Sequence, residues 1–136
     1  MNNKNWPSDF PENCPPEEAT VSGDVFYRLV DCIPPTKDDF LRSCDEPRNK
    51  GRDIKSASDV INVHGLSIFR DERDAWKTKD KYKRPMRNKK LVSGALNADL
   101  GVVAQTYTPS HHTLWLYENA EPEKVINNEV TRKTDV

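Results

Sequence analysis

The segment VVAQTYTPSHHTLWLYE, from Val102 to Glu118, decides the expected fold. It opens on β-branched and small residues, Tyr107 to Ser110 are typical of a turn, and His112 to Tyr117 alternate small or polar residues with large ones. Alternation with a period of two indicates a half-buried strand. The segment therefore predicts a β-hairpin, and we expect this hairpin to form the middle of a small sheet.

The rest of the chain predicts further strands and two short helices around that hairpin. Strands are expected at residues 25–30, 65–69 and 89–96, where apolar and β-branched residues gather. Thr36 and Asp71 are typical N-cap residues, so we expect a short helix after Thr36 and a second from Glu72 to about Tyr82. This order predicts a single compact α+β domain with a mostly antiparallel sheet.

Three regions differ in composition. Residues 1–23 are rich in proline and predict an extended arm, which we expect Trp6 and Phe10 to pin against the domain. Residues 24–126 form the single domain, in which the charged stretch 45–58 is expected to be a surface loop. Residues 127–136 are polar and predict a flexible C-terminal tail.

Bulk composition limits the compartment and the partners. The chain has 136 residues and a net charge of -1, which excludes a globally basic nucleic-acid binder but allows a local basic patch. We expect no membrane segment and no signal peptide, because no apolar run is long enough. Cys14, Cys32 and Cys44 fit reduced thiols, which indicates a cytoplasmic protein, although one disulfide with a spare thiol stays open.

A basic segment spans residues 77–90. It holds eight lysines or arginines and one acid, Asp80, which gives a local formal charge of +7. Such a run can follow the phosphates of a nucleic acid or bind an acidic protein, and a solvated helix without a partner is the alternative. The candidate binding residues are Lys81, Lys83, Arg84 and Arg87, with His111 from the hairpin.

Arg28 and Ser67 are candidate catalytic residues on the early strands. A guanidinium among the apolar residues of 25–30 faces solvent, pairs with a buried acid, or points into a cleft where its fork suits a carboxylate or phosphate. Ser67 lies in a strand just before a helix start, where a hydroxyl could bind ribose or phosphate close to backbone donors. The alternative for Ser67 is a small residue that serves packing.

The hairpin supplies two histidines and a carboxylate. His111 and His112 are expected on opposite faces of a strand, and His64 is the only other histidine, so no metal site is expected. Either imidazole could donate a proton or orient a ligand, and His112 is the candidate catalytic one. Glu118 is a candidate base at the end of the hairpin. For all three residues, local hydrogen bonding or solvation is the alternative.

The order of Arg28 on a first strand, Ser67 on a strand that leads into a helix, and Glu118 at a late strand end resembles the arginine–serine–glutamate layout of small bacterial ADP-ribosyltransferase-like domains. The resemblance implies that Arg28 supports the phosphates of NAD, Ser67 shapes the pocket, and Glu118 activates the acceptor or the ribose. The chain departs from the pattern at Leu116, where the family has an acid or glutamine. NAD is expected only under this resemblance, and otherwise no cofactor is.

Two main functions follow as hypotheses. The first is a small intracellular binding protein that uses segment 77–90 and the N-terminal arm on a protein or nucleic-acid partner. The second is an ADP-ribosyltransferase-like enzyme or nucleotide-binding domain, so the sequence leaves enzymatic activity open. A third is a structural subunit whose oligomer surface includes Trp6, Trp76 and Trp115.

Overall fold

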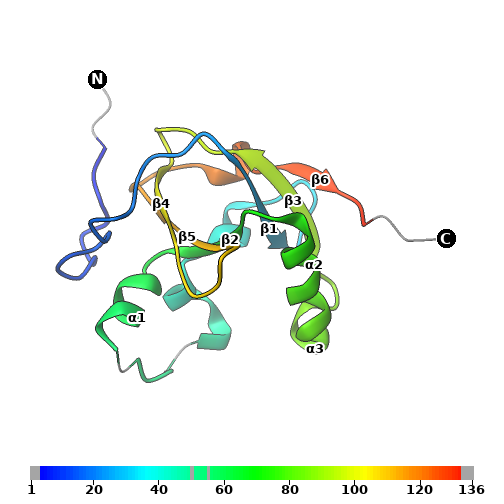
Figure 1. The fold of residues 1–136 in the computed structure, drawn as a ribbon, viewed down its shortest axis with the longest axis horizontal. Helices are drawn as coiled ribbons and strands as arrows, with labels where there is room; N and C mark the ends of the chain where they lie inside the picture. The colour runs from blue at the N-terminus through cyan, green and yellow to red at the C-terminus, as the bar shows by residue number, and fades with distance from the viewer. Residues whose placement is uncertain (1–3, 50, 55, 133–136) are drawn as a thin grey trace.

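The computed structural model describes residues 4–49, 51–54 and 56–132, and its centre is one antiparallel sheet of six strands (Figure 1). The strand order across the sheet is β4-β5-β2-β1-β3-β6. The strands are β1 (Val25–Val30), β2 (Leu66–Phe69), β3 (Lys90–Ala95), β4 (Gly101–Gln105), β5 (His111–Leu116) and β6 (Asn128–Val130). The predicted α+β class with an antiparallel sheet is confirmed.

Three α-helices pack beside this sheet: α1 (Ala57–Asn62), α2 (Glu72–Lys81) and α3 (Lys83–Met86). Asp71 caps α2 as predicted, because its side chain accepts a hydrogen bond from the Arg73 amide. The helix expected after Thr36 is the 3-10 helix η1 (Lys37–Phe40), and the capping box of Thr36 and Asp39 is present. Three more 3-10 helices are η2 (Ser43–Asp45), η3 (Pro47–Asn49) and η4 (Pro122–Lys124).

Helix α1 shortens the expected surface loop at 45–58 by its last two residues, Ala57 and Ser58. Ser56 caps it by accepting a hydrogen bond from the Asp59 amide at 3.0 Å, so the helix begins inside the charged stretch. The start of this helix was not predicted from the sequence, because its first turn carries few apolar residues. None of the helices in the described part of the chain is long and apolar enough to cross a bilayer.

The hairpin formed by β4 and β5 lies at one edge of the sheet, so its predicted central position is wrong. Strand β5 pairs with β2 on its inner side, and the middle of the sheet is β2 and β1. The outer edge of β4 meets the N-terminal arm, where Thr20 and Val103 exchange two backbone hydrogen bonds of 2.9 and 2.8 Å. The arm thereby covers an edge that could otherwise pair with another chain.

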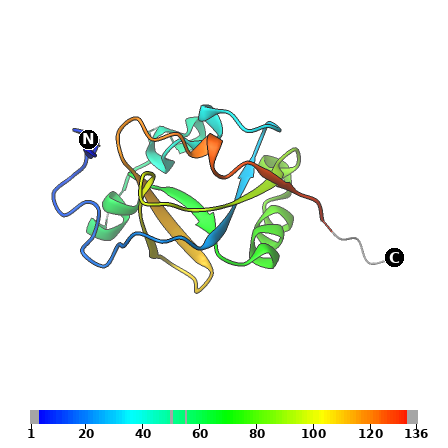
Figure 2. The ribbon, with the colours of Figure 1, turned by 90° about the horizontal axis from the view of Figure 1, so that it is seen from above.

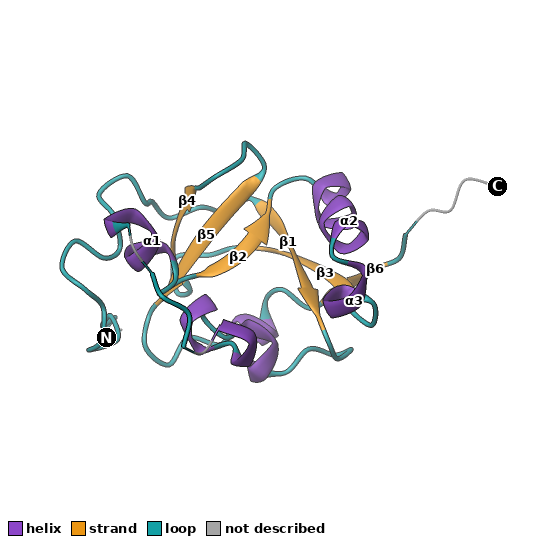
Figure 3. Cartoon of the chain, turned by 90° about the horizontal axis from the view of Figure 1, so that it is seen from below, coloured by secondary structure: helices purple, strands orange, loops and turns teal. Residues whose placement is uncertain are grey.

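Two apolar clusters bury the two faces of the sheet. One face carries Phe26, Ile68 and Leu114, which pack with other fully buried residues into the larger cluster. On the other face, α2 and α3 cover Leu29 and Leu91 with the side chains of Ala75 and Met86. Figure 3 shows α2 and α3 beside β1 and β3, whereas α1 lies beside β4 and β5. The helices therefore stand at opposite ends of the sheet.

The N-terminal arm is held against the end of the domain that carries α1. Trp6 stacks on Tyr117 with ring centroids 4.3 Å apart, and Phe10 stacks on Trp6 at 5.7 Å. The predicted pinning of the arm by Trp6 and Phe10 is confirmed. Figure 2 shows the arm at one end of the molecule and α2 and α3 at the other.

Residues 128–130 correct the expected flexible tail. They form β6, which pairs with β3 through Leu91↔Val130 and two further register pairs. Val130 packs against the cluster under α2, and Arg132 pairs with Asp80 through an Nη1–Oδ1 distance of 2.8 Å. Residues 133–136 of the expected tail lie outside the described residues.

Candidate functional site

Arg28 is buried and forms hydrogen bonds within the protein. It is only 9% exposed, which overturns the solvent-facing alternative. Its Nε donates to the Asp39 carbonyl at 3.0 Å and its Nη1 to the Ser67 carbonyl at 2.7 Å, while Nη2 lies 3.7 Å from Glu46 Oε1. The guanidinium supports the narrow contact between β1 and β2, whose register holds the single pair Tyr27↔Phe69. This arrangement fits the structural ion pair among the three alternatives.

Ser67 and His111 are hydrogen-bonded across β2 and β5. Ser67 Oγ lies 3.0 Å from His111 Nε2, and the other ring nitrogen lies 2.9 Å from Thr106 Oγ1 and 3.2 Å from the Thr106 carbonyl. Thr106 Oγ1 continues the chain to Thr113 Oγ1 at 2.8 Å. The sequence analysis missed Thr106, whose only signal was its position just before the turn.

The environment of His111 favours the neutral imidazole. Burial lowers the pKa of His111 below its ordinary value of 6.5, and the hydrogen bond to Thr106 opposes this effect without cancelling it. A carbonyl only accepts, so the bond to Thr106 O places the proton on Nδ1 and leaves Nε2 to accept the Ser67 hydroxyl. A serine hydroxyl that donates to a neutral imidazole has the same hydrogen-bond direction as a nucleophile beside its general base.

His112 and Glu118 lie apart from this pair. His112 faces the opposite side of the sheet, where its ring contacts Phe26 at 5.0 Å, so the predicted opposite facing of the two histidines is confirmed. Glu118 follows the far end of β5, is exposed, and its amide donates to Asn5 O at 2.8 Å. The structure thus joins the side chains of Ser67 and His111 on one face of the sheet, whereas Arg28 reaches only the Ser67 backbone from the other face and Glu118 and His112 lie elsewhere.

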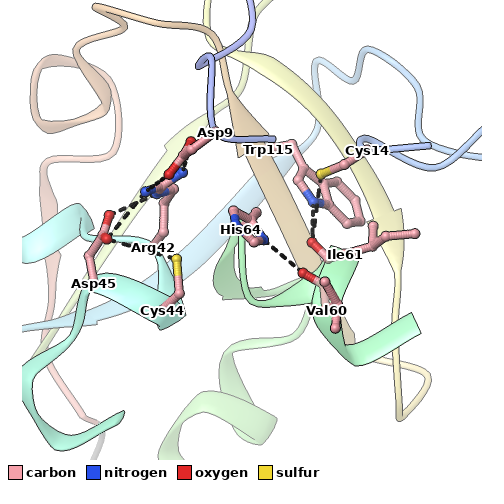
Figure 4. A network of polar contacts seen from close by, with 9 residues as sticks. All are labelled: Asp9, Cys14, Arg42, Cys44, Asp45, Val60, Ile61, His64 and Trp115. Atoms are coloured by element: carbon pink, nitrogen blue, oxygen red, sulfur yellow. Dashed lines mark hydrogen bonds and ion pairs between the residues drawn. The ribbon is translucent and has the colours of Figure 1, made fainter. Parts of the chain in front are cut away.

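A second polar network ties the arm to the domain (Figure 4). Arg42 donates to both carboxylate oxygens of Asp9 at 2.8 Å and also binds Asp45 at 2.7 Å. Cys14 and Cys44 lie on this side of the molecule as free thiols, and burial raises the pKa of Cys14 to about 11. A thiol of that pKa is a poor nucleophile at neutral pH. The ion pairs of Arg42 with Asp9 and Asp45 join the arm to η2.

Among the described residues, no group of three or more histidine, cysteine or acidic side chains could hold a metal ion.

The basic segment divides into inward and outward cations. Lys79 donates to the Lys89 carbonyl at 2.6 Å, and Lys89 pairs with Asp31 at 3.1 Å, so these two lysines support the fold. The other six cations of the segment are exposed: Lys77, Lys81, Lys83, Arg84, Arg87 and Lys90. Arg73, Lys77 and Lys81 follow one another at intervals of four residues along α2, so they form a row on one helix face.

This row begins at a surface depression of about 940 Å³ at the start of α2. Its wall includes Trp76 and Tyr27, together with the cations Arg73, Lys77 and Arg132. The sequence analysis missed the aromatic residues and Arg73 as site residues. The four-residue spacing of Arg73, Lys77 and Lys81 was a readable signal, whereas the approach of Arg132 depends on β6.

No protein-family model matches this chain, and no curated protein or solved structure is detectably similar to it.

Proposed function

We propose that the protein binds single-stranded nucleic acid on the outer side of α2 and α3. We call this region the basic surface and define it by Arg73, Lys77, Lys81, Lys83, Arg84 and Arg87. The observation that carries the proposal is the row of Arg73, Lys77 and Lys81 on one face of α2, continued by the exposed cations of α3. All six side chains are exposed to solvent.

The dimensions of the row suit a short stretch of nucleic acid. Eight residues of α-helix separate Arg73 from Lys81, a rise of about 12 Å. A strand stacked as in a duplex advances about 3.4 Å per nucleotide, so the row matches about three or four stacked nucleotides, and fewer nucleotides of an extended single strand. Neutralising these phosphates releases counterions, which gives affinity without an overall positive charge on the protein.

Aromatic side chains favour a nucleic acid over an acidic protein as the partner. Tyr82 is 48% exposed between α2 and α3, and Lys81 Nζ lies 5.4 Å from its ring centroid. Trp76 stands beside Lys77 in the depression. Cations interleaved with aromatic rings are the arrangement by which proteins bind single strands, because bases stack on the rings while phosphates meet the cations.

The N-terminal arm is not part of this proposal. It lies at the end of the molecule opposite α2 and α3 (Figure 2). Its Trp6 side chain is stacked on Tyr117. The arm serves the fold by covering β4, so we assign the binding to α2 and α3 alone.

The test is charge reversal with a matched control. We expect the triple variant Lys81→Glu, Lys83→Glu, Arg84→Glu to bind a fluorescent 15-nucleotide single strand at least about tenfold more weakly than the unaltered protein at about 50 mM salt. The control reverses three exposed cations elsewhere: Lys37→Glu, Arg52→Glu, Lys124→Glu. Both variants change the net charge equally, so only position distinguishes them.

Fluorescence anisotropy measures the affinity, and circular dichroism checks that both variants are folded. Equal weakening by the two triple variants would mean that overall charge governs the binding and that the basic surface has no special role. Absence of binding by the unaltered protein at low salt would overturn the proposal.

A further inference from the structure

We infer that the depression at the start of α2 holds one nucleotide of the bound strand, with its base on Trp76 and its phosphate between Arg73 and Lys77. This inference rests on the proposed function and names the unit that is recognised. It is carried by the combination of aromatic rings and cations around one hollow of about 940 Å³.

Trp76 lines the hollow as a partly buried side chain that also packs on the apolar cluster under α2. Its Nε1 donates to Glu72 Oε2 at 3.0 Å, so the polar edge of the indole is already satisfied within the helix. The guanidinium of Arg132 lies over the ring, with Cζ 5.3 Å from the centroid. Tyr27 reaches the same hollow from β1. A planar base can stack beside these groups without competing for the indole N–H.

The cations of the hollow outnumber its free acids. The side chain of Arg73 is 83% exposed, and Lys77 is exposed one helical turn further on. Asp71 also lies in the wall, and its carboxylate accepts from both the Arg73 amide at 2.9 Å, as the cap of α2, and the Arg73 guanidinium at 2.9 Å. Glu72 is bound to Trp76. The two acids therefore hold the site together. A phosphate would share the donors of the exposed Arg73 guanidinium with Asp71 and would also meet Lys77.

The aromatic rings and the cations of the hollow together favour a nucleotide as the ligand. A bare polyphosphate would use the cations but not Trp76, and an uncharged aromatic compound would use Trp76 but not the cations. A nucleotide uses both, because it joins a planar base to a phosphate.

The experiment compares two 15-nucleotide probes with the same backbone: oligothymidylate, and a fully abasic strand of equal length. We expect the protein to bind the base-bearing probe about tenfold more tightly, because stacking on an aromatic side chain is lost in the abasic strand. The preference should disappear in Trp76→Leu, persist in part in Trp76→Phe, and remain unchanged in the control variant Lys37→Glu.

The outcomes separate this inference from the proposed function. Equal, salt-dependent binding of the two probes would overturn the nucleotide site but leave the basic surface intact. To keep the site testable if polymers do not bind, thymidine 5′-monophosphate is titrated against the isotope-labelled protein. A shift of the Trp76 indole N–H resonance that is lost in Arg73→Ala supports the site, and no shift at millimolar nucleotide overturns it.

Discussion

At the scale of single residues, Arg28 shows how a side chain that looks functional can be required by the fold. It supplies hydrogen bonds to the carbonyls of Asp39 and Ser67 at the point where β1 and β2 separate. The sequence could show that a guanidinium among apolar neighbours needs a partner. It could not show which partner, because Asp39, Glu46 and Ser67 approach Arg28 only in the folded chain.

We predict that Arg28→Met lowers the free energy of unfolding by about 3 kcal/mol, because removing one partner of a buried, hydrogen-bonded charge leaves the others unsatisfied. Chemical denaturation measures the change. Arg73→Met, which alters a largely exposed arginine, is the control and should change stability by less than about 0.5 kcal/mol. Equal stabilities for the two variants would show that the buried contacts of Arg28 contribute little.

His111 predicts a pH dependence of stability. Because burial lowers its pKa below 6.5 in the folded protein, the unfolded chain binds the proton first as the pH falls. The stability contributed by neutral His111 is therefore complete above about pH 6.5 and declines as the pH falls below that value. His111→Gln should flatten this part of the profile, as measured by denaturation between pH 7.5 and 5. An unchanged profile in the variant would contradict the assignment.

At the scale of elements, local sequence patterns predicted whether a segment is a strand or a helix better than they predicted where that element lies in the sheet. Alternation identified the β4–β5 hairpin, and Asp71 marked the start of α2 to the residue. The place of the hairpin at the sheet edge was not predictable, because it depends on β2 pairing with β5 across 44 residues of sequence between Ser67 and His111. Likewise, β6 forms only because β3 offers an open edge.

A glycine on β3 tests how closely the C-terminal segment packs on the sheet. A β-carbon at Gly94 would lie 2.1 Å from the Val125 carbonyl oxygen, and the obstacle is backbone. We predict that Gly94→Ala costs about 3 kcal/mol of stability through overpacking. Gly23→Ala is the control, because its nearest neighbour would be 4.0 Å away. Similar unfolding midpoints for both variants would show that the segment after β5 is loosely held.

At the scale of the whole molecule, the two ends of the sheet have different roles. The end near α1 is consolidated by the arm, with Trp6 on Tyr117 and Arg42 bound to Asp9. The end near α2 and α3 carries the exposed cations and the depression. The charge and the bounds of the basic segment were predictable from the sequence. The division into inward Lys79 and outward Lys77 and Lys81 was not, because it depends on the packing of α2 against the sheet.

The most direct test of the central claim is a two-dimensional amide NMR titration of the labelled protein with a short single-stranded oligonucleotide. We expect the shifted resonances to cluster on α2 and α3 and at the Trp76 indole, while the resonances of the arm and α1 stay unchanged. Shifts that cluster instead around Trp6 and Tyr117, or no shifts at low salt, would contradict it.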